Sequence, residues 1–228
     1  MKKILTGNQA VARGVYEAGV HFASAYPGTP STEILENIGT YKEIVAEWAP
    51  NEKVALEAVI GASIAGGRSL AAMKHVGVNV AADPLFTFAY TGVNGGSVLI
   101  TADEPGMHSS QNEQDNRNYA KFAKIPMFEP SNSQESKDMV KYAFDFSEKF
   151  NSIVLYRMTT RVCHSKGSVT LGERVEVPIK KYEKDFDKYV AVPAIGRKLR
   201  HKVEERLNLL KEYSETSKWN YKVDNKSK

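Results

Sequence analysis

Short apolar runs alternate with helical segments along the first two thirds of this chain, and that alternation limits the fold more than any other feature. The apolar runs have the length of buried strands; they lie at 20–26, 44–48, 69–74, 97–102, a short stretch near Met127, and 152–158. Strands that alternate with helices imply a parallel sheet covered on both faces. The sequence therefore predicts an α/β fold with a doubly wound, mostly parallel sheet.

The first predicted helix, at 6–19, has both ends marked. Thr6 and Gln9 have the spacing of a capping box, and Gly19 follows the last turn. A second helix is expected to start with Thr29 as its N-cap and Pro30 at its first position. These signals place two helices around the first strand.

Further helices are predicted at 51–66 and 79–91. A later one shows apolar side chains at i, i+3, i+4 and i+7, namely Met139, Tyr142, Ala143 and Phe146. That spacing gives a helix with one buried face.

The pattern changes after Ser165. Residues 173–189 are charged and show no regular period, and they precede a strongly charged helix with Leu199, Val203, Leu207 and Leu210 on one face. From Ser217 onward we expect a frayed or truncated end. The sequence thus predicts an α/β domain at 1–168, followed at 169–228 by an extended charged segment and an amphipathic helical tail that leads toward further domains.

Composition excludes several classes of protein. A single cysteine, Cys163, rules out a disulfide framework or a multi-cysteine cluster within these 228 residues, and we expect it to be a buried apolar residue. The net charge of +4 comes mostly from the tail, where it favours docking or solubility over nucleic-acid binding. There is no secretory signal and no long apolar run. We expect a cytoplasmic protein without a membrane span.

In open α/β sheets, ligands bind beyond the carboxyl ends of the strands. The first loop there is Tyr26-Pro27-Gly28-Thr29-Pro30, a rigid turn whose backbone can approach a ligand closely. A plain strand-to-helix turn would have the same residues, so the loop alone does not establish a site.

Glu52 stands in the first turn of the next predicted helix. It could simply complement the helix dipole, or it could serve a ligand with a basic nitrogen that benefits from a fixed carboxylate. Glu57 is a weaker candidate because it points about 140° away, at about 100° per residue.

Two more loops complete the edge. His75 and Gly77 lie between a strand and a helix, and the long polar stretch 101–115 contains carboxylates, amides, hydroxyls and a histidine. A loop of that length is usually functional or mobile. The glycine patterns of dinucleotide and P-loop sites, the G-x-S-x-G elbow and the H-E-x-x-H zinc motif do not occur.

Taken in order, these loops resemble the 2-oxoacid:ferredoxin oxidoreductases. Gly7-Asn8-Gln9-Ala10 and the turn up to Ser31 are similar to the opening of that family. The indolepyruvate branch is indicated by three further motifs: Asn51-Glu52-Lys53-Val54-Ala55, Met73-Lys74-His75-Val76-Gly77-Val78-Asn79 and Ser109-Ser110-Gln111-Asn112-Glu113-Gln114-Asp115. The resemblance runs from about Gly7 to Ser165, and the basic helical tail is also similar.

The resemblance implies a domain that holds the aminopyrimidine of thiamine diphosphate. Glu52 would hydrogen-bond a ring nitrogen, which helps to remove the proton from the thiazolium carbon, and Thr29 would stand beside the substrate. The implied catalytic residues are Glu52 and Thr29; the cofactor-binding residues are Tyr26, Pro27, Gly28, Glu52, His75 and Gly77; the substrate-binding residues are Thr29, His75, Asp103, Gln111 and Asn112. Pyruvate-specific relatives carry an arginine near Asp103, so its absence favours a larger aryl 2-oxoacid.

The resemblance also implies partners. No G-D-G…N motif for Mg²⁺ and diphosphate and no cysteine-rich ferredoxin segment occur in these residues. Mg²⁺ and iron–sulfur clusters are therefore expected only on missing domains or on partner chains of an oligomeric complex, which would pass electrons from the 2-oxoacid to ferredoxin and the acyl group to coenzyme A. No metal site is expected within the chain itself. Two alternatives remain: a non-catalytic or truncated homologue that acts in assembly or regulation, and an unrelated flavin- or nucleotide-binding protein of the same fold class.

Overall fold

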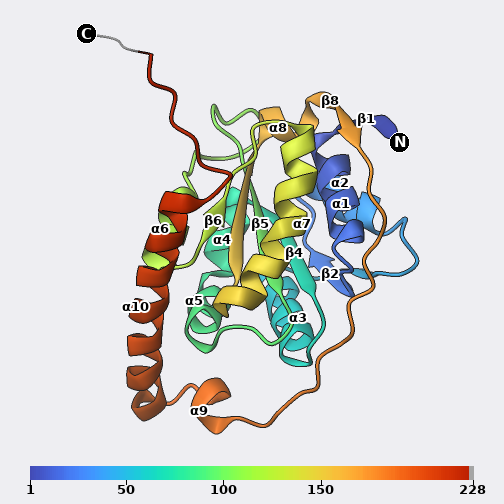
Figure 1. Ribbon diagram of the computed structural model, residues 1–228. Coiled ribbons are helices and arrows are strands. Elements are labelled where there is room, and N and C mark those ends of the chain that lie inside the picture. Colours follow the sequence, from blue (N-terminus) through green and yellow to red (C-terminus); the bar gives the residue numbers. More distant parts are fainter. Residues whose placement is uncertain (226–228) are drawn as a thin grey trace.

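The computed structural model describes residues 1–225 and contains a six-stranded parallel sheet (Figure 1). The strands are β2 (Phe22–Ala25), β3 (Val45–Trp48), β4 (Ser69–Lys74), β5 (Ser97–Asp103), β6 (Met127–Phe128) and β7 (Val154–Thr159), in the order β3-β2-β4-β5-β7-β6. All neighbouring strands run parallel. Each strand coincides with an apolar run of the sequence, so the predicted fold class is confirmed.

One face of the sheet is covered by α1 (Gly7–Glu17), α2 (Thr32–Ile38) and α7 (Ser133–Phe150). The predicted capping box is present at the start of α1, where Thr6 and Gln9 bond each other reciprocally. On α7, the predicted face is confirmed: Met139, Ala143 and Phe146 are buried. The second helix was wrongly placed, because α2 begins at Thr32 with Ser31 as its N-cap.

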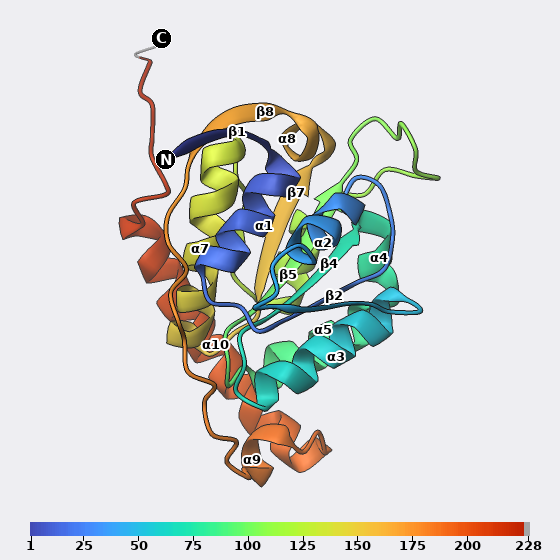
Figure 2. The ribbon, with the colours of Figure 1, turned by 90° about the vertical axis from the view of Figure 1, so that its right-hand side faces the viewer.

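The other face is covered by α3 (Glu52–Ile64), α4 (His75–Val80) and α5 (Ala82–Thr91) (Figure 2), and α6 (Arg117–Ala123) packs into the same core. The single helix predicted at 79–91 was wrong, since helical structure begins four residues earlier and is interrupted at Ala81. Pro84 has no N–H to bond the carbonyl of Val80, so the first helix ends there and a second begins.

Two strands were missed by the sequence analysis. Strand β1 (Lys2–Thr6) pairs antiparallel with β8 (Lys166–Thr170), which follows the short helix α8 (Thr160–His164). β7 is therefore not the last strand of the chain. Cys163 on α8 is fully buried, as the sequence predicted. Burial raises the pKa of its thiol.

Beyond β8 the chain packs back against the domain. Residues 171–185 cross the amino edge of the sheet, where Val175 N donates to Glu17 O at 3.1 Å and Lys180 N donates to Gly66 O at 3.0 Å. Gly66 has φ +99°, and a Cβ there would lie 1.9 Å from Lys180 O, so this crossing requires glycine. The predicted domain boundary after residue 168 falls inside β8.

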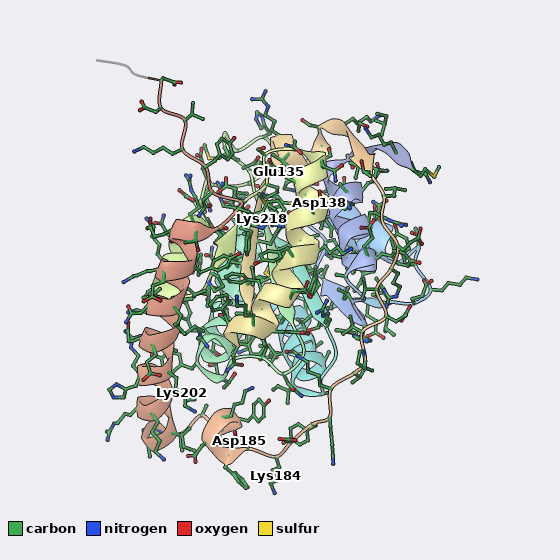
Figure 3. All side chains as sticks on the ribbon, in the orientation of Figure 1. Glu135, Asp138, Lys184, Asp185, Lys202 and Lys218 are labelled. Atoms are coloured by element: carbon green, nitrogen blue, oxygen red, sulfur yellow. The ribbon has the colours of Figure 1, made fainter. Side chains whose placement is uncertain are left out.

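The helical tail consists of α9 (Phe186–Tyr189) and α10 (Pro193–Thr216). Along α10, Leu199, Val203 and Leu210 are buried, in agreement with the predicted apolar face. In Figure 3, Lys202 lies near the lower end of α10 and Lys218 beyond its upper end, so α10 carries the chain from the amino edge toward the carboxyl edge of the sheet.

The expectation of a frayed end from Ser217 was wrong for the first residues of that segment. Ser217 is buried, and the Trp219 ring lies 6.0 Å from that of Tyr142. Residues 226–228 lie outside the described part of the chain. None of the helices within residues 1–225 is both long and apolar enough to cross a membrane.

Candidate functional site

The parallel register brings the predicted loops to one edge of the sheet. Ala25 at the end of β2 lies opposite Trp48 and Ala72, and Lys74 at the end of β4 lies opposite Ala102. The loops that follow these strands therefore leave at the same edge, as predicted. In Figure 2 the loop after β5 projects at this edge.

Within that edge, the crevice between β2 and β4 has a special position. The chain leaves β2 toward α2 on one face of the sheet and leaves β4 toward α4 on the other. Neighbouring loops thus diverge, and doubly wound sheets bind ligands at such a switch point.

Glu52 lies at this crevice as the first residue of α3. Asn51 caps the helix by accepting a hydrogen bond from Val54 N at 3.0 Å. The Glu52 side chain is buried, with 9% of its residue surface exposed, yet within residues 1–225 its carboxylate has no hydrogen bond or ion pair. Glu57, one turn further on, is exposed and lies 3.9 Å from Lys53. The two glutamates differ as the sequence predicted.

The backbone of Gly77 forms the surface on which Glu52 rests. A Cβ on Gly77 would lie 2.6 Å from Glu52 Oε1 and 2.7 Å from its Cγ. Such distances are far shorter than an optimal contact of about 3.5 Å. Only glycine leaves room for the carboxylate at this place.

The turn after β2 is held by short-range hydrogen bonds. Gly28 N donates to Thr32 Oγ1 at 2.9 Å, and Ser31 donates to Gly28 O through both its N–H and its hydroxyl at 2.8 Å. A Cβ on Gly28 would meet Lys74 Cδ at 3.0 Å, so the turn lies against the end of β4. Tyr26 and Thr29 are exposed on this turn.

His75 is fully buried beneath the loop that follows β5. Its Nε2 lies 3.0 Å from Asn112 O, and its Nδ1 is buried without a partner among the described residues. Gln111 and Asn112 are exposed on the loop itself. Contact between His75 and a substrate would require this loop to move.

Asp103 does not present its carboxylate to the crevice. It is fully buried, and its Oδ2 accepts from Arg157 Nε at 2.7 Å and from Asn116 N at 2.9 Å. Its Oδ1 accepts from Thr101 Oγ1 at 3.1 Å. With both oxygens engaged, Asp103 anchors the loop, which argues against the predicted substrate contact.

Several residues of this edge were missed by the sequence reasoning. Asn116 donates to His75 O at 3.1 Å and to Thr101 Oγ1 at 2.7 Å, which closes the far end of the loop. Arg157 is a charged and buried residue inside the mostly apolar strand β7, and its charge in such a sequence is a signal that could have been used. Asn8 belongs to the motif Gly7-Asn8-Gln9-Ala10, but the sequence predicted no individual role for it.

Glu104 shapes the start of the same loop. It is almost fully buried and accepts hydrogen bonds from Ser109 N and Oγ at 3.0 Å and from the Ser110 hydroxyl. Burial opposes its ionisation, but these bonds outweigh that effect, and the pKa of Glu104 lies below its ordinary value. No group of three or more acidic, histidine or cysteine side chains within residues 1–225 is arranged to hold a metal ion.

The chain is similar to a known protein family and to several of its members. Residues 13–194 match the family described as pyruvate flavodoxin/ferredoxin oxidoreductase, thiamine diphosphate-binding. Indolepyruvate oxidoreductase subunit IorA from Archaeoglobus fulgidus is 48% identical over 96% of this chain and 37% of its own length. The IorA subunit from Pyrococcus horikoshii is 46% identical over 96% of this chain and 35% of its own.

More distant relatives share the same region. The 2-oxoglutarate synthase subunit KorA of Methanocaldococcus jannaschii is 28% identical over 77% of this chain and 50% of its own length. A structure of the 2-oxoglutarate:ferredoxin oxidoreductase from Magnetococcus marinus superposes with a TM-score of 0.72 at 18% identity, over 93% of this chain and 45% of that one. It shows the same fold.

The chain thus spans little more than a third of the length of the IorA relatives. The resemblance read from the loop motifs is confirmed by a family match that covers most of the sheet and its helices. The chain belongs to the pyruvate flavodoxin/ferredoxin oxidoreductase family and spans its thiamine diphosphate-binding region.

Proposed function

We propose that this chain is the part of a thiamine diphosphate-dependent 2-oxoacid:ferredoxin oxidoreductase that holds the aminopyrimidine of the cofactor and one side of the 2-oxoacid pocket. The observation that carries the proposal is the largely buried side chain of Glu52, whose carboxylate lies against Gly77 and has no hydrogen-bond or ion-pair partner within residues 1–225. A buried carboxylate costs free energy unless it is hydrogen-bonded. A ligand with a basic ring nitrogen would supply that bond, and an aminopyrimidine fits.

Thiamine diphosphate, when bound, supplies the carbanion chemistry that decarboxylates 2-oxoacids, while the protein orients and tunes it. Glu52 would hold a charge-assisted hydrogen bond to the ring nitrogen, a bond about twice as strong as a neutral one. Gly77 leaves room for the Glu52 carboxylate, and Gly28 lets the turn that carries Tyr26 and Pro27 lie against Lys74; these residues would hold the aminopyrimidine.

The exposed hydroxyl of Thr29 would contact the 2-oxoacid, and Gln111 and Asn112 would face it from the loop after β5. His75 supports that loop through Asn112 O. In this proposal Asp103 positions the loop rather than binding substrate, because its carboxylate is fully engaged. An aryl 2-oxoacid such as indolepyruvate is the proposed substrate, in keeping with the IorA relatives.

The same edge presents apolar surface for a partner. Tyr26, Trp48 and Met107 belong to loops or strand ends at this edge, Val54 belongs to the first turn of α3, and each is at least 39% exposed. Apolar side chains grouped around a polar site mark an interaction surface. We propose that a diphosphate- and Mg²⁺-binding domain or chain covers this edge. A ferredoxin-type chain of the same cytoplasmic complex would carry the electrons to ferredoxin, and coenzyme A would accept the acyl group.

The test compares two glutamates of the same helix. In a complex reconstituted with the diphosphate-binding and iron–sulfur partners, Glu52→Gln should lower indolepyruvate-dependent ferredoxin reduction by about 10²–10⁴-fold, the range of a general acid–base contribution. Glu57→Gln, which removes an exposed carboxylate from α3, should leave turnover unchanged. Urea unfolding of both variants controls for stability.

A mere dipole role for Glu52 predicts a different result. The variant would then lose about 0.3–1 kcal/mol of unfolding free energy and keep its turnover. Near-normal activity of Glu52→Gln would refute the assignment and favour a non-catalytic role in assembly or regulation.

A further inference from the structure

Asn8, on the first turn of α1, connects three parts of the molecule. It is 1% exposed, and its Nδ2 donates to Pro30 O at 2.8 Å and to Glu33 Oε2 at 3.1 Å. The two acceptors fix the orientation of the amide, because the opposite orientation would place an oxygen against a carboxylate. One side chain thus joins α1 to the Thr29 turn and to the first turn of α2.

The start of α1 is a rigid base for this contact. Thr6 and Gln9 close the capping box at 3.0 and 3.2 Å. A Cβ on Gly7 would lie 2.0 Å from Val162 O, so the helix begins in direct contact with α8. A side chain on a capped and closely packed helix end holds a precise position.

The turn itself has few other attachments. Its remaining hydrogen bonds run within residues 26–31 or to α2, at Thr32 and Ile34. Within the described chain, the Asn8 bond to Pro30 O is the one hydrogen bond that joins this turn to an element other than α2. Gly28 packs against Lys74 at the end of β4, and Asn8 supplies the hydrogen bond that holds the Thr29 side of the turn against α1.

We propose that Asn8 is a positioning residue that fixes the turn carrying Thr29 for contact with the 2-oxoacid. This inference rests on the proposed function, in which Thr29 lies beside the substrate. Asn8 acts through the turn and does not itself touch the reacting groups.

The charged groups around Asn8 decide what a substitution would do. Glu33 on α2 contacts it directly, and His164 Nε2 on α8 lies 3.9 Å from Glu33 Oε1. Lys166 on β8 lies opposite Thr6. On α7, Lys137 and Lys141 pair with Glu17 at the far end of α1.

Asn8→Asp replaces the donor with a carboxylate of the same shape beside Glu33. Two carboxylates so close raise the pKa of one of them. At low pH a shared proton can replace the amide donor, whereas at higher pH both groups ionise and repel. In the reconstituted complex, the KM for indolepyruvate should therefore rise with pH, with kcat/KM about 10–100-fold below wild type above neutrality, the scale of a misplaced contact group.

Gln9→Glu is the matched control. It adds the same charge one residue further along α1, at an exposed capping-box position where glutamate is equally suitable. It should keep the wild-type KM and pH profile. In the double variant Asn8→Asp, Glu33→Gln, the amide of residue 33 can donate to the carboxylate of residue 8, so the hydrogen bond is restored in the opposite direction. The KM for indolepyruvate should then return part of the way to the wild-type value.

A second measurement does not depend on turnover. Hydrogen exchange of the isolated chain should show faster exchange of the Ser31 amide in Asn8→Asp than in wild type or Gln9→Glu, with similar urea midpoints. If Asn8→Asp and Gln9→Glu behave alike in exchange and in KM, the positioning role is wrong. If the wild-type complex is inactive but the Ser31 amide still exchanges faster in Asn8→Asp, the proposed function is wrong, whereas the structural role of Asn8 in holding the turn is retained.

Discussion

Gly77 offers the most specific test of how the site is built. The change Gly77→Ala adds one methyl group at 2.6 Å from Glu52 Oε1. An optimal contact needs about 3.5 Å, so the carboxylate must move by about 1 Å. A misplacement of that size at a reacting centre can cost about 10²-fold in rate, which corresponds to about 2.7 kcal/mol.

The assay is indolepyruvate-dependent ferredoxin reduction by the reconstituted complex. Gly77→Ala should lower kcat/KM by about 10²-fold while the fold is retained, because alanine is favoured over glycine within a helix by about 1 kcal/mol. Gly61→Ala is the control, since Gly61 lies exposed on α3 with nothing within 4 Å of an added Cβ. It should stabilise the chain slightly and leave turnover unchanged.

The effects of Gly77→Ala and Glu52→Gln on kcat/KM should not be additive. If Gly77 acts only by making room for Glu52, Gly77→Ala should cost nothing further in a Glu52→Gln background. Normal kcat/KM in the single variant, or an undiminished effect in the double variant, would refute the link between the glycine and the carboxylate.

Two further predictions concern stability and cofactor binding. Glu17 is fully buried and accepts from Gly172 N at 2.6 Å, Arg13 Nε at 2.9 Å and Lys137 Nζ at 3.0 Å, so Glu17→Gln should cost about 3–5 kcal/mol of unfolding free energy at pH 7. Burial raises the pKa of Glu17, but these bonds outweigh that effect and hold the pKa below 4.5. The carboxylate therefore stabilises the fold fully above about pH 4.5, and this stabilisation is lost as the pH falls through the lower folded-state pKa. Urea unfolding at several pH values checks this, and a difference in unfolding free energy between wild type and variant that does not shrink in acid contradicts it. Calorimetry of the isolated chain with Mg²⁺ and thiamine diphosphate should give weak binding or none, because the ligands that Mg²⁺ and diphosphate require are expected on a partner. Micromolar affinity would mean that a diphosphate site lies within this chain.

The candidate site was only partly readable from the sequence. Glu52 and its contrast with Glu57 could be predicted, because helical spacing alone decides which of them faces the sheet edge. The burial of the Asp103 carboxylate, which argues against a substrate contact, could not have been predicted in that way. Its partners Arg157 and Asn116 lie 54 and 13 residues away and meet it only in the folded sheet.

The sequence by itself determined the α/β class, the capping box of α1 and the exact bounds of strand β4, Ser69–Lys74. These features depend on local periodicity and on neighbours within a few residues. The tertiary structure alone decided the pairing of β1 with β8, which joins short, mostly exposed segments at least 160 residues apart whose few apolar residues form no regular pattern. It also decided that Asn8 reaches Pro30 and that Gly77 makes room for Glu52. Such contacts depend on where separate elements pack, and no short-range pattern of residues records them.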